Sequence, residues 1–208
     1  MKIDFKKLAC VLLSLFALSD ANSFACDETS TLRLFESRYS GYEYDVSKQV
    51  VPQQIRTILS AGRLAPSSYN EQPWRFIVCD RNQNRQAYEK ALGCLVEENK
   101  DWAKNAPVLI ICLSDIQSAY TQKKNDWAEY DTGAASMSLM LQAASMGLMA
   151  HQMGGFDSDK VKKEFSIPEN VVPMSIMSIG YSAGEPKLKN RKPLGENFFL
   201  GEWGCSVE

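Results

Sequence analysis

The sequence has few of the residues on which metal sites and redox pairs depend. It contains one histidine and six cysteines among 208 residues, and no two cysteines are spaced as C-x-x-C. The sequence therefore predicts neither a metal site nor a redox-active cysteine pair. The cysteines after residue 25 are odd in number and widely spaced. This excludes a disulfide framework, and we expect most of these cysteines to be core residues.

Phosphate-binding glycine loops are also absent. Neither G-x-G-x-x-G nor G-x-x-x-x-G-K-[ST] occurs in the sequence. Charge of one sign is not in excess either, because 23 basic and 25 acidic residues give a net charge of −2. We therefore expect no nucleic-acid partner and no strong attraction to a membrane surface. Any bound phosphate must be held by side chains from distant parts of the chain.

Residues 1–25 differ in composition from the rest of the sequence. Three lysines precede the apolar run 8–18, and small residues follow it up to Ala25. This order is typical of a secretory signal peptide. The run is shorter than the roughly 20 residues that a transmembrane helix needs. We therefore expect a signal peptide over 1–25, an exported protein, and a single domain over 26–208. The alternative is an amphipathic first helix on a cytoplasmic protein.

Helices and strands alternate along the remaining chain. Periodicity and punctuating residues predict helices over 52–65, 82–95, 131–148 and 158–165, and strands over 75–79, 107–113 and 174–179. The continuous apolar run 107–113 indicates a strand buried on both faces. The stretch 131–148 is apolar or small on every side, so it should lie in the core or at a subunit interface. The pattern predicts one α+β domain.

The stretch 180–184, Gly-Tyr-Ser-Ala-Gly, fits the G-x-S-x-G nucleophile elbow of hydrolases. Two features disfavour that interpretation. Glu185 and Pro186 follow where a helix should begin, and the single histidine, His151, precedes the serine instead of following it. A turn at the end of a strand explains the stretch better. With no partner residue in the sequence, His151 is expected to be a core or site-lining residue.

Two pairs of side chains that could bind a phosphate lie near the two ends of the domain. Pro186 and Pro193 bracket a basic segment that should be extended, in which Lys189 and Arg191 point the same way. Arg38 and Ser40 repeat the spacing of two with a cation and a hydroxyl. Arginine binds phosphate through two parallel hydrogen bonds. The alternative for the basic segment is a solvated loop.

Together these features resemble the nitroreductase family of flavoproteins, over about residues 32–203. The most specific stretch is 65–76, Ala-Pro-Ser-Ser-Tyr-Asn-Glu-Gln-Pro-Trp-Arg-Phe, which lies between an expected helix and an expected strand. Other matching stretches are 36–40, the end of the expected helix 131–148, 154–157, 178–181 and 191–194. Their order and spacing match the family.

The resemblance implies a three-layer α+β fold with a central mixed or antiparallel sheet flanked by helices. It also implies an intertwined homodimer that binds FMN without a covalent bond at the subunit interface. The implied cofactor-binding residues fall in three groups. They are Arg38, Tyr39, Ser40, Lys189 and Arg191 at the phosphate and ribityl chain; Ser67, Ser68 and Asn70 at the flavin, from the partner subunit; and Gly154 and Gly155, whose amides approach the ring.

The activity implied is transfer of hydride from NAD(P)H through flavin to a small acceptor, such as a nitroaromatic or a quinone. The alternatives are another reaction on the same fold and cofactor, such as dehalogenation or dehydrogenation, or a flavin-binding protein without catalysis. No residue is assigned a catalytic role, because the cofactor carries the chemistry. One position departs from the family. Tyr42 stands two residues after Ser40, where relatives usually carry Arg or Lys, and this leaves flavin affinity and redox potential open.

Overall fold

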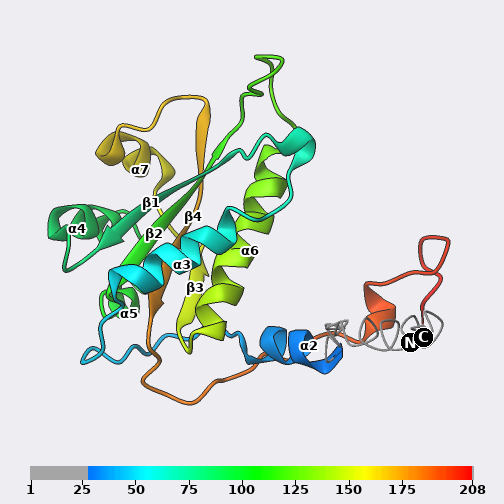
Figure 1. The fold of residues 1–208 in the computed structure, drawn as a ribbon, viewed down its shortest axis with the longest axis horizontal. Coiled ribbons are helices and arrows are strands. Elements are labelled where there is room, and N and C mark those ends of the chain that lie inside the picture. The colour runs from blue at the N-terminus through cyan, green and yellow to red at the C-terminus, as the bar shows by residue number, and fades with distance from the viewer. Residues whose placement is uncertain (1–27, 208) are drawn as a thin grey trace, which may run out of the picture. The chain divides into compact units, whose positions relative to one another are not determined.

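The protein is described by a computed structural model of residues 28–207 (Figure 1). The expected signal peptide lies outside the described residues. From Leu34 onward the chain groups into one unit. The first described helix is α2 (Glu28–Ser37).

A four-stranded antiparallel sheet forms the centre of the fold. Its strands are β1 (Trp74–Asp80), β2 (Val108–Asp115), β3 (Met149–Met153) and β4 (Val171–Gly180), in the order β1-β2-β4-β3. All three strand pairs are antiparallel. The sequence predicted β1, β2 and β4, and it missed the short strand β3.

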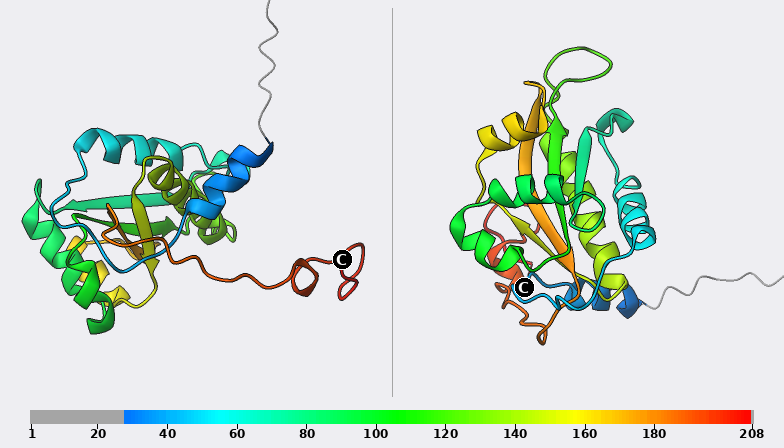
Figure 2. Two further views of the ribbon diagram at one scale, coloured as in Figure 1. Left: turned by 90° about the horizontal axis from the view of Figure 1, so that it is seen from below. Right: turned by 90° about the vertical axis from the view of Figure 1, so that its left-hand side faces the viewer.

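Helices cover both faces of this sheet (Figures 1 and 2). They are α3 (Pro52–Gly62) and α6 (Ala128–Ser145) on one face, and α4 (Arg85–Gly93), α5 (Glu97–Ala103) and α7 (Ser158–Phe165) on the other. Side chains of β2 alternate between the two cores. Ile110 packs with α3 and α6, whereas Leu109 and Ile111 pack with α4, α5 and α7. The expected three-layer α+β fold is confirmed, as is the burial of β2 on both faces.

Local capping sets where the helices begin and end. Helix α7 matches its predicted range, and Asp157 accepts a hydrogen bond from the Lys160 amide at 2.9 Å. Helix α4 begins later than predicted because the Asp80 carboxylate accepts from the Asn82 amide at 2.8 Å and holds a turn there. Helix α6 ends earlier than predicted because Gly147 has a φ of 71°, the left-handed conformation that terminates helices.

Helix α6 is buried along one face within a single chain. The side chains of this face recur every three or four residues and include Ala128, Ala135, Leu139 and Ala143. The opposite face is more accessible, with Gly133 exposed and other small or apolar residues half-buried. The sequence predicted a helix that is apolar or small on every side. In the structure one face of α6 is buried within the chain, and the opposite face is only partly covered.

The stretch 180–184 ends β4 in a turn. Ser182 forms a bridge with Tyr44, and its hydroxyl donates to the Gly184 carbonyl at 2.8 Å. No helix follows until the short 3-10 helix η2 (Leu194–Glu196). The prediction of a strand-ending turn is confirmed, and the hydrolase interpretation is excluded by this geometry.

Within residues 28–207, no helix combines the length and the apolar character needed to cross a membrane. The same part of the chain contains no group of three or more His, Cys, Asp or Glu side chains placed to hold a metal ion.

Candidate functional site

Two segments from opposite ends of the unit meet beside the sheet and enclose a cavity. They are held together by the Asp45 amide, which donates to the Tyr181 carbonyl at 2.9 Å, and by the Ala183 amide, which donates to the Glu43 carbonyl at 3.0 Å. The cavity has a volume of about 540 Å³, and we call it the cation cavity. Its lining residues are Phe35, Glu36, Arg38, Tyr39, Ser40, Tyr42, His151, Lys187, Leu188, Lys189 and Arg191.

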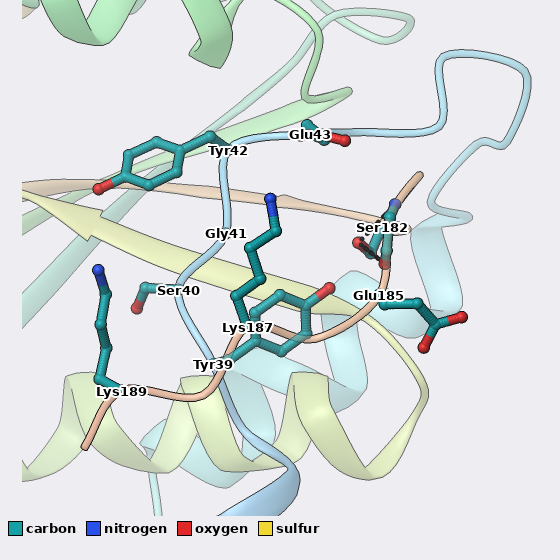
Figure 3. Close-up of a pocket in the computed structure, with 10 residues that line it drawn as sticks. Tyr39, Ser40, Gly41, Tyr42, Glu43, Ser182, Glu185, Lys187 and Lys189 are labelled. Carbon is teal, nitrogen blue, oxygen red and sulfur yellow. Dashed lines mark hydrogen bonds between the residues drawn. The ribbon is translucent and has the colours of Figure 1, made fainter. Parts of the chain in front are cut away.

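A smaller cavity of about 250 Å³ adjoins the cation cavity, and five residues line both. In Figure 3, Ser40 and Lys189 lie on one side of the segment 39–43, and Ser182 and Glu185 lie on the other. The two volumes together match the size range of small-molecule and cofactor sites.

Unpaired positive charge distinguishes the cation cavity. Four cationic residues line it: Arg38, Lys187, Lys189 and Arg191. Among the described residues none of these four forms an ion pair, whereas the neighbouring Lys192 pairs with Glu196 at 3.1 Å. Partial burial and the nearby Arg191 lower the pKa of Arg38. Like charges held together without a counterion are costly, so this arrangement suits a bound anion.

Hydroxyl groups complete the donor set. Arg38 Nη1 donates to Ser40 Oγ at 3.4 Å. The Tyr39 hydroxyl is buried and has no hydrogen-bond partner within residues 28–207. A buried hydroxyl without a partner is unfavourable, and Tyr39 lines both cavities. Guanidinium, ammonium and hydroxyl donors around one cavity match the chemistry of a phosphate ester that carries a polyol chain.

Two lining residues of the cation cavity, Tyr42 and His151, belong to an aromatic cluster with Trp102. The ring centroids of Tyr42 and Trp102 are 5.1 Å apart, those of Tyr42 and His151 are 5.1 Å apart, and those of Trp102 and His151 are 4.6 Å apart. The Nδ1 atom of His151 donates to the Gly41 carbonyl at 2.9 Å. Tyr42 therefore contributes an aromatic ring to this part of the cavity, at the position where the family resemblance implies a cation.

The stretch 65–73, which we call the helix-end loop, lies elsewhere in the chain. Its 3-10 helix η1 (Ser68–Asn70) is held at the first turn of α6, where the Ser68 amide donates to Asp131 Oδ2 at 2.9 Å. The Ser67 hydroxyl accepts from the Gln72 amide at 3.0 Å. None of the predicted site residues in this loop lines either cavity.

The helix-end loop and the segment 39–43, which lines the cation cavity, lie at opposite ends of α6 (Figure 1). The helix has 18 residues and so spans about 27 Å. The loop contacts its first turn, whereas Met149, just beyond its last turn, lies so close to Gly41 that an added Cβ would approach Met149 Sδ at 2.5 Å. Within one chain the two groups of predicted residues are therefore too far apart to bind the same small ligand.

Gly154 and Gly155 form the third predicted group, and neither lines the cation cavity or the smaller cavity beside it. The Gly155 carbonyl accepts from the Val96 amide at 3.1 Å and from Asn99 Nδ2 at 3.0 Å. A Cβ at Gly155 would lie 2.7 Å from Asn99 Nδ2, so a larger residue there would have to displace the Asn99 side chain. Gly154 is exposed, and a Cβ added to it would meet nothing within 4 Å.

The structure thus brings together Arg38, Tyr39, Ser40, Lys189 and Arg191, and it separates them from the other predicted residues. Sequence reasoning expected His151 to be a core or site-lining residue, and it did not assign Lys187 or Trp102 to this site. The basic cluster contained a signal for Lys187. The approach of Trp102 to His151 depends on packing between distant segments, and no local pattern indicates it.

Comparison with known proteins gives consistent matches. A protein of Methanothermobacter thermautotrophicus with the provisional name NADH dehydrogenase/NAD(P)H nitroreductase is 33% identical over 159 residues, which cover 74% of this chain and 78% of that protein. A crystal structure described as an oxidoreductase containing FMN is 30% identical, with a TM-score of 0.77, and the match covers 83% of this chain and 92% of that one.

An FMN-dependent nitroreductase from Clostridium difficile R20291 is 25% identical, with a TM-score of 0.69 and cover of 83% of this chain and 99% of that one. Residues 35–181 match the sequence pattern that defines the nitroreductase family. This chain belongs to the nitroreductase family.

Proposed function

We propose that this protein is an FMN-dependent oxidoreductase that passes hydride from NAD(P)H through the flavin to a nitroaromatic, a quinone or a related acceptor. Its membership of the nitroreductase family and the FMN-containing relatives support the cofactor and the reaction class. When bound, FMN supplies the hydride chemistry, and the protein supplies binding, orientation and electrostatics.

The observation that carries the proposal is the group of unpaired cations around the cation cavity. Arg38, Lys189 and Arg191 bind the FMN phosphate, since none of them has a counterion among the described residues. The hydroxyls of Tyr39 and Ser40 donate to the phosphate or to the ribityl chain. A charge-assisted hydrogen bond of this kind contributes roughly 1.5 to 3 kcal/mol, so three cations suffice for stable binding without a covalent bond.

A homodimer completes the site. Ser67, Ser68 and Asn70 of one copy contact the flavin whose phosphate is held by the cation cavity of the other copy. The separation of these residues along α6 within one chain supports this arrangement, because a single chain cannot bring them to one flavin (Figure 1). Among the described residues the Ser68 hydroxyl and the side-chain amide of Asn70 make no hydrogen bond, so both remain available to a ligand.

Exposed apolar surface gives independent support for the dimer. The half-covered face of α6 suits a second copy, since subunit interfaces are more apolar than other surfaces. The segment after β4 also exposes large side chains, namely Leu188, Leu194, Phe198, Leu200 and Trp203, and the last of these is 91% exposed. Such a segment is stabilised when it packs along a partner subunit in an intertwined dimer.

No residue of the chain is assigned an acid–base role. His151 and Tyr42 line the cation cavity, and they shape it instead of exchanging protons with a substrate in this proposal. In this proposal NAD(P)H and the acceptor bind one after the other against the same flavin, in a ping-pong cycle.

The visible spectrum of the purified protein, followed by a turnover assay, tests the proposal. We expect flavin absorbance that heat denaturation releases into solution, and NAD(P)H consumption that depends on a nitro compound or a quinone. A colourless protein that FMN does not reconstitute would exclude the proposed cofactor. Retained FMN without turnover would support the alternative of a non-catalytic flavin-binding protein.

We also propose that the protein is exported, because residues 1–25 have the composition of a secretory signal peptide. The N-terminal sequence of the protein isolated from its native cell tests this. A chain that begins at Cys26 supports export, and a chain that retains residues 1–25 contradicts it.

A further inference from the structure

The only histidine of the sequence, His151, lies in the wall of the cation cavity. It belongs to β3, and its ring contacts the rings of Tyr42 and Trp102, which also contact each other. Neither the sequence pattern nor the proposed function gives this residue a task. Its surroundings nevertheless define its chemical state in detail.

The hydrogen bond to Gly41 fixes the tautomer of the imidazole. A carbonyl oxygen can only accept, so Nδ1 carries the proton in this 2.9 Å bond. In the neutral ring Nε2 is therefore unprotonated. Among the described residues Nε2 has no hydrogen-bond partner. Any proton that the ring gains is added at Nε2.

Cations dominate the charge around the ring. Burial, and after it the charges of Arg38 and Lys189, lower the pKa of His151, against the opposing effect of the Gly41 hydrogen bond. The titratable and charged groups that line the cavity with it are Glu36, Arg38, Tyr39, Tyr42, Lys187, Lys189 and Arg191. Glu36 is the only carboxylate among these lining residues, so positive charge exceeds negative charge.

The remaining elements packed on the ring add no charge to this balance. On α5, Trp102 contacts the ring, and the flanking Asp101 and Lys104 face each other at 4.0 Å in an exposed ion pair. On β4, the Ser178 hydroxyl donates to the His151 carbonyl at 3.3 Å. The aromatic faces of Tyr42 and Trp102 favour a cationic ring, because aromatic rings attract cations within about 6 Å.

We propose that His151 is a further ligand-binding residue of the cation cavity, which is neutral in the free protein and takes up a proton from solvent when a phosphate dianion binds. The proposal rests on the proposed function, because FMN is the phosphate ester concerned. A dianion among Arg38, Lys189 and Arg191 cancels the repulsion that disfavours a charged imidazole. The protonated ring then adds one more positive charge on the side of the cavity where Tyr42 replaces a permanent cation.

The direction of the pH dependence follows from linkage. The pKa of His151 is below its ordinary value in the free protein and rises in the complex. Between these two values the complex holds one more proton than the free protein, so FMN affinity increases as pH falls through that window. Each unit by which binding raises the pKa corresponds to about a tenfold gain in affinity across the window.

Nuclear magnetic resonance of the imidazole ring tests the proposal directly, because the untagged chain has a single histidine. The ring signals of the full chain, stripped of flavin, are followed against pH alone, with FMN, and with inorganic phosphate. We expect FMN to raise the titration midpoint by about one pH unit and phosphate to raise it in the same direction. An unchanged midpoint in a protein that demonstrably binds FMN overturns the proposal and leaves the proposed function intact.

Calorimetry with His151→Asn supplies the matched control. Asn can keep the donor to the Gly41 carbonyl, and it does not titrate. The phosphate of FMN itself titrates near pH 6, and this effect is the same in both proteins. The ratio of wild-type to His151→Asn affinity for FMN should rise about tenfold as pH falls through the window, and a constant ratio contradicts the proposal.

The measurements with FMN and with inorganic phosphate also distinguish failure of this proposal from failure of the proposed function. If FMN does not bind at all, the proposed function fails. The phosphate arm then decides the role of His151: a raised midpoint supports anion-linked protonation, and an unchanged midpoint overturns it.

Discussion

The cation cavity and the helix-end loop are organised by different physical means, although both are assigned to the same flavin. In the cation cavity, long side chains on irregular segments converge without counterions, and repulsion between Arg38 and Arg191 is unrelieved. In the helix-end loop, three non-glycine residues have positive φ angles, 52° at Tyr69, 57° at Asn70 and 49° at Gln72. One region holds unsatisfied charge and the other holds backbone strain.

Hydrogen bonds to neighbouring elements hold the strained loop in place. The Glu71 carboxylate accepts from Ser118 Oγ at 2.5 Å, from the Ala119 amide at 3.3 Å and from Asn125 Nδ2 at 3.2 Å. These contacts hold the loop in one conformation without a ligand, as expected of a surface that recognises a ring by its shape. The cation cavity instead depends on its ligand to balance its charge. The comparison predicts that mutations in the cavity affect affinity, whereas mutations of the residues that hold the loop in place, such as Glu71, affect local stability first.

The largest effect is expected for Arg191→Ala. Loss of a bidentate contact to phosphate should weaken FMN binding at least about tenfold, since such contacts contribute roughly 1.5 to 3 kcal/mol. Lys192→Ala is the matched control, because Lys192 pairs with Glu196 and does not line the cavity. Titration of FMN into each flavin-free variant measures both. Equal losses would mean that the basic segment acts only as a diffuse positive field.

A smaller effect, and of a different kind, is expected for Glu71→Gln. The change removes a charged acceptor from three donors, so the free energy of local unfolding should fall by about 1 to 2 kcal/mol. Hydrogen exchange of the amides in residues 116–127 reports this. Glu129→Gln serves as the control, because Glu129 is exposed and makes no hydrogen bond or ion pair among the described residues. Unchanged exchange in Glu71→Gln would show that the loop is held by other contacts.

The smallest effect is expected for Tyr42→Lys, which introduces the cation that the family resemblance implies at this position. One further positive charge at a half-open cavity should strengthen FMN binding about twofold to fivefold at low salt, in line with roughly 0.2 to 1 kcal/mol for an exposed charge pair. High salt should remove the gain. Tyr42→Phe keeps the ring and should leave affinity unchanged. Weaker binding by Tyr42→Lys would show that the contacts of Tyr42 with Trp102 and His151 matter more than charge.

Much of the fold could be predicted from local sequence signals, and the exceptions have identifiable causes. The apolar run of β2 and the Asp157 cap of α7 are unambiguous patterns, and both predictions are confirmed. Strand β3 was missed because its five residues, Met-Ala-His-Gln-Met, contain no β-branched side chain. It pairs along one edge with β4, and that contact stabilises it as a strand.

The candidate site was less accessible to sequence reasoning. Spacing alone indicated that Arg38 and Ser40, or Lys189 and Arg191, could grip a phosphate, and the structure brings these two pairs into one cavity. Resemblance to the family, and not spacing, assigned Ser67, Ser68 and Asn70 to the same flavin. The contact of Trp102 with His151 could not be predicted, since it depends on how α5 packs beside β3 in three dimensions.

The central claim is that one FMN is held by the cation cavity of one copy and the helix-end loop of another. Complementation between two damaged chains tests it most directly. One chain carries Arg38→Ala and Arg191→Ala, and the other carries Ser68→Ala and Asn70→Ala. Each chain alone should form dimers that bind FMN weakly. In a mixed dimer, one site combines the intact cavity of the second chain with the intact loop of the first.

The two chains are unfolded, mixed and refolded together. The number of FMN molecules bound per mixed dimer is the decisive measurement. The account predicts that mixed dimers, separated by different affinity tags, bind one FMN per dimer with the affinity of the wild-type protein. Mixed dimers that lack a tight FMN site would contradict the account, because they would show that cavity and loop act within the same chain.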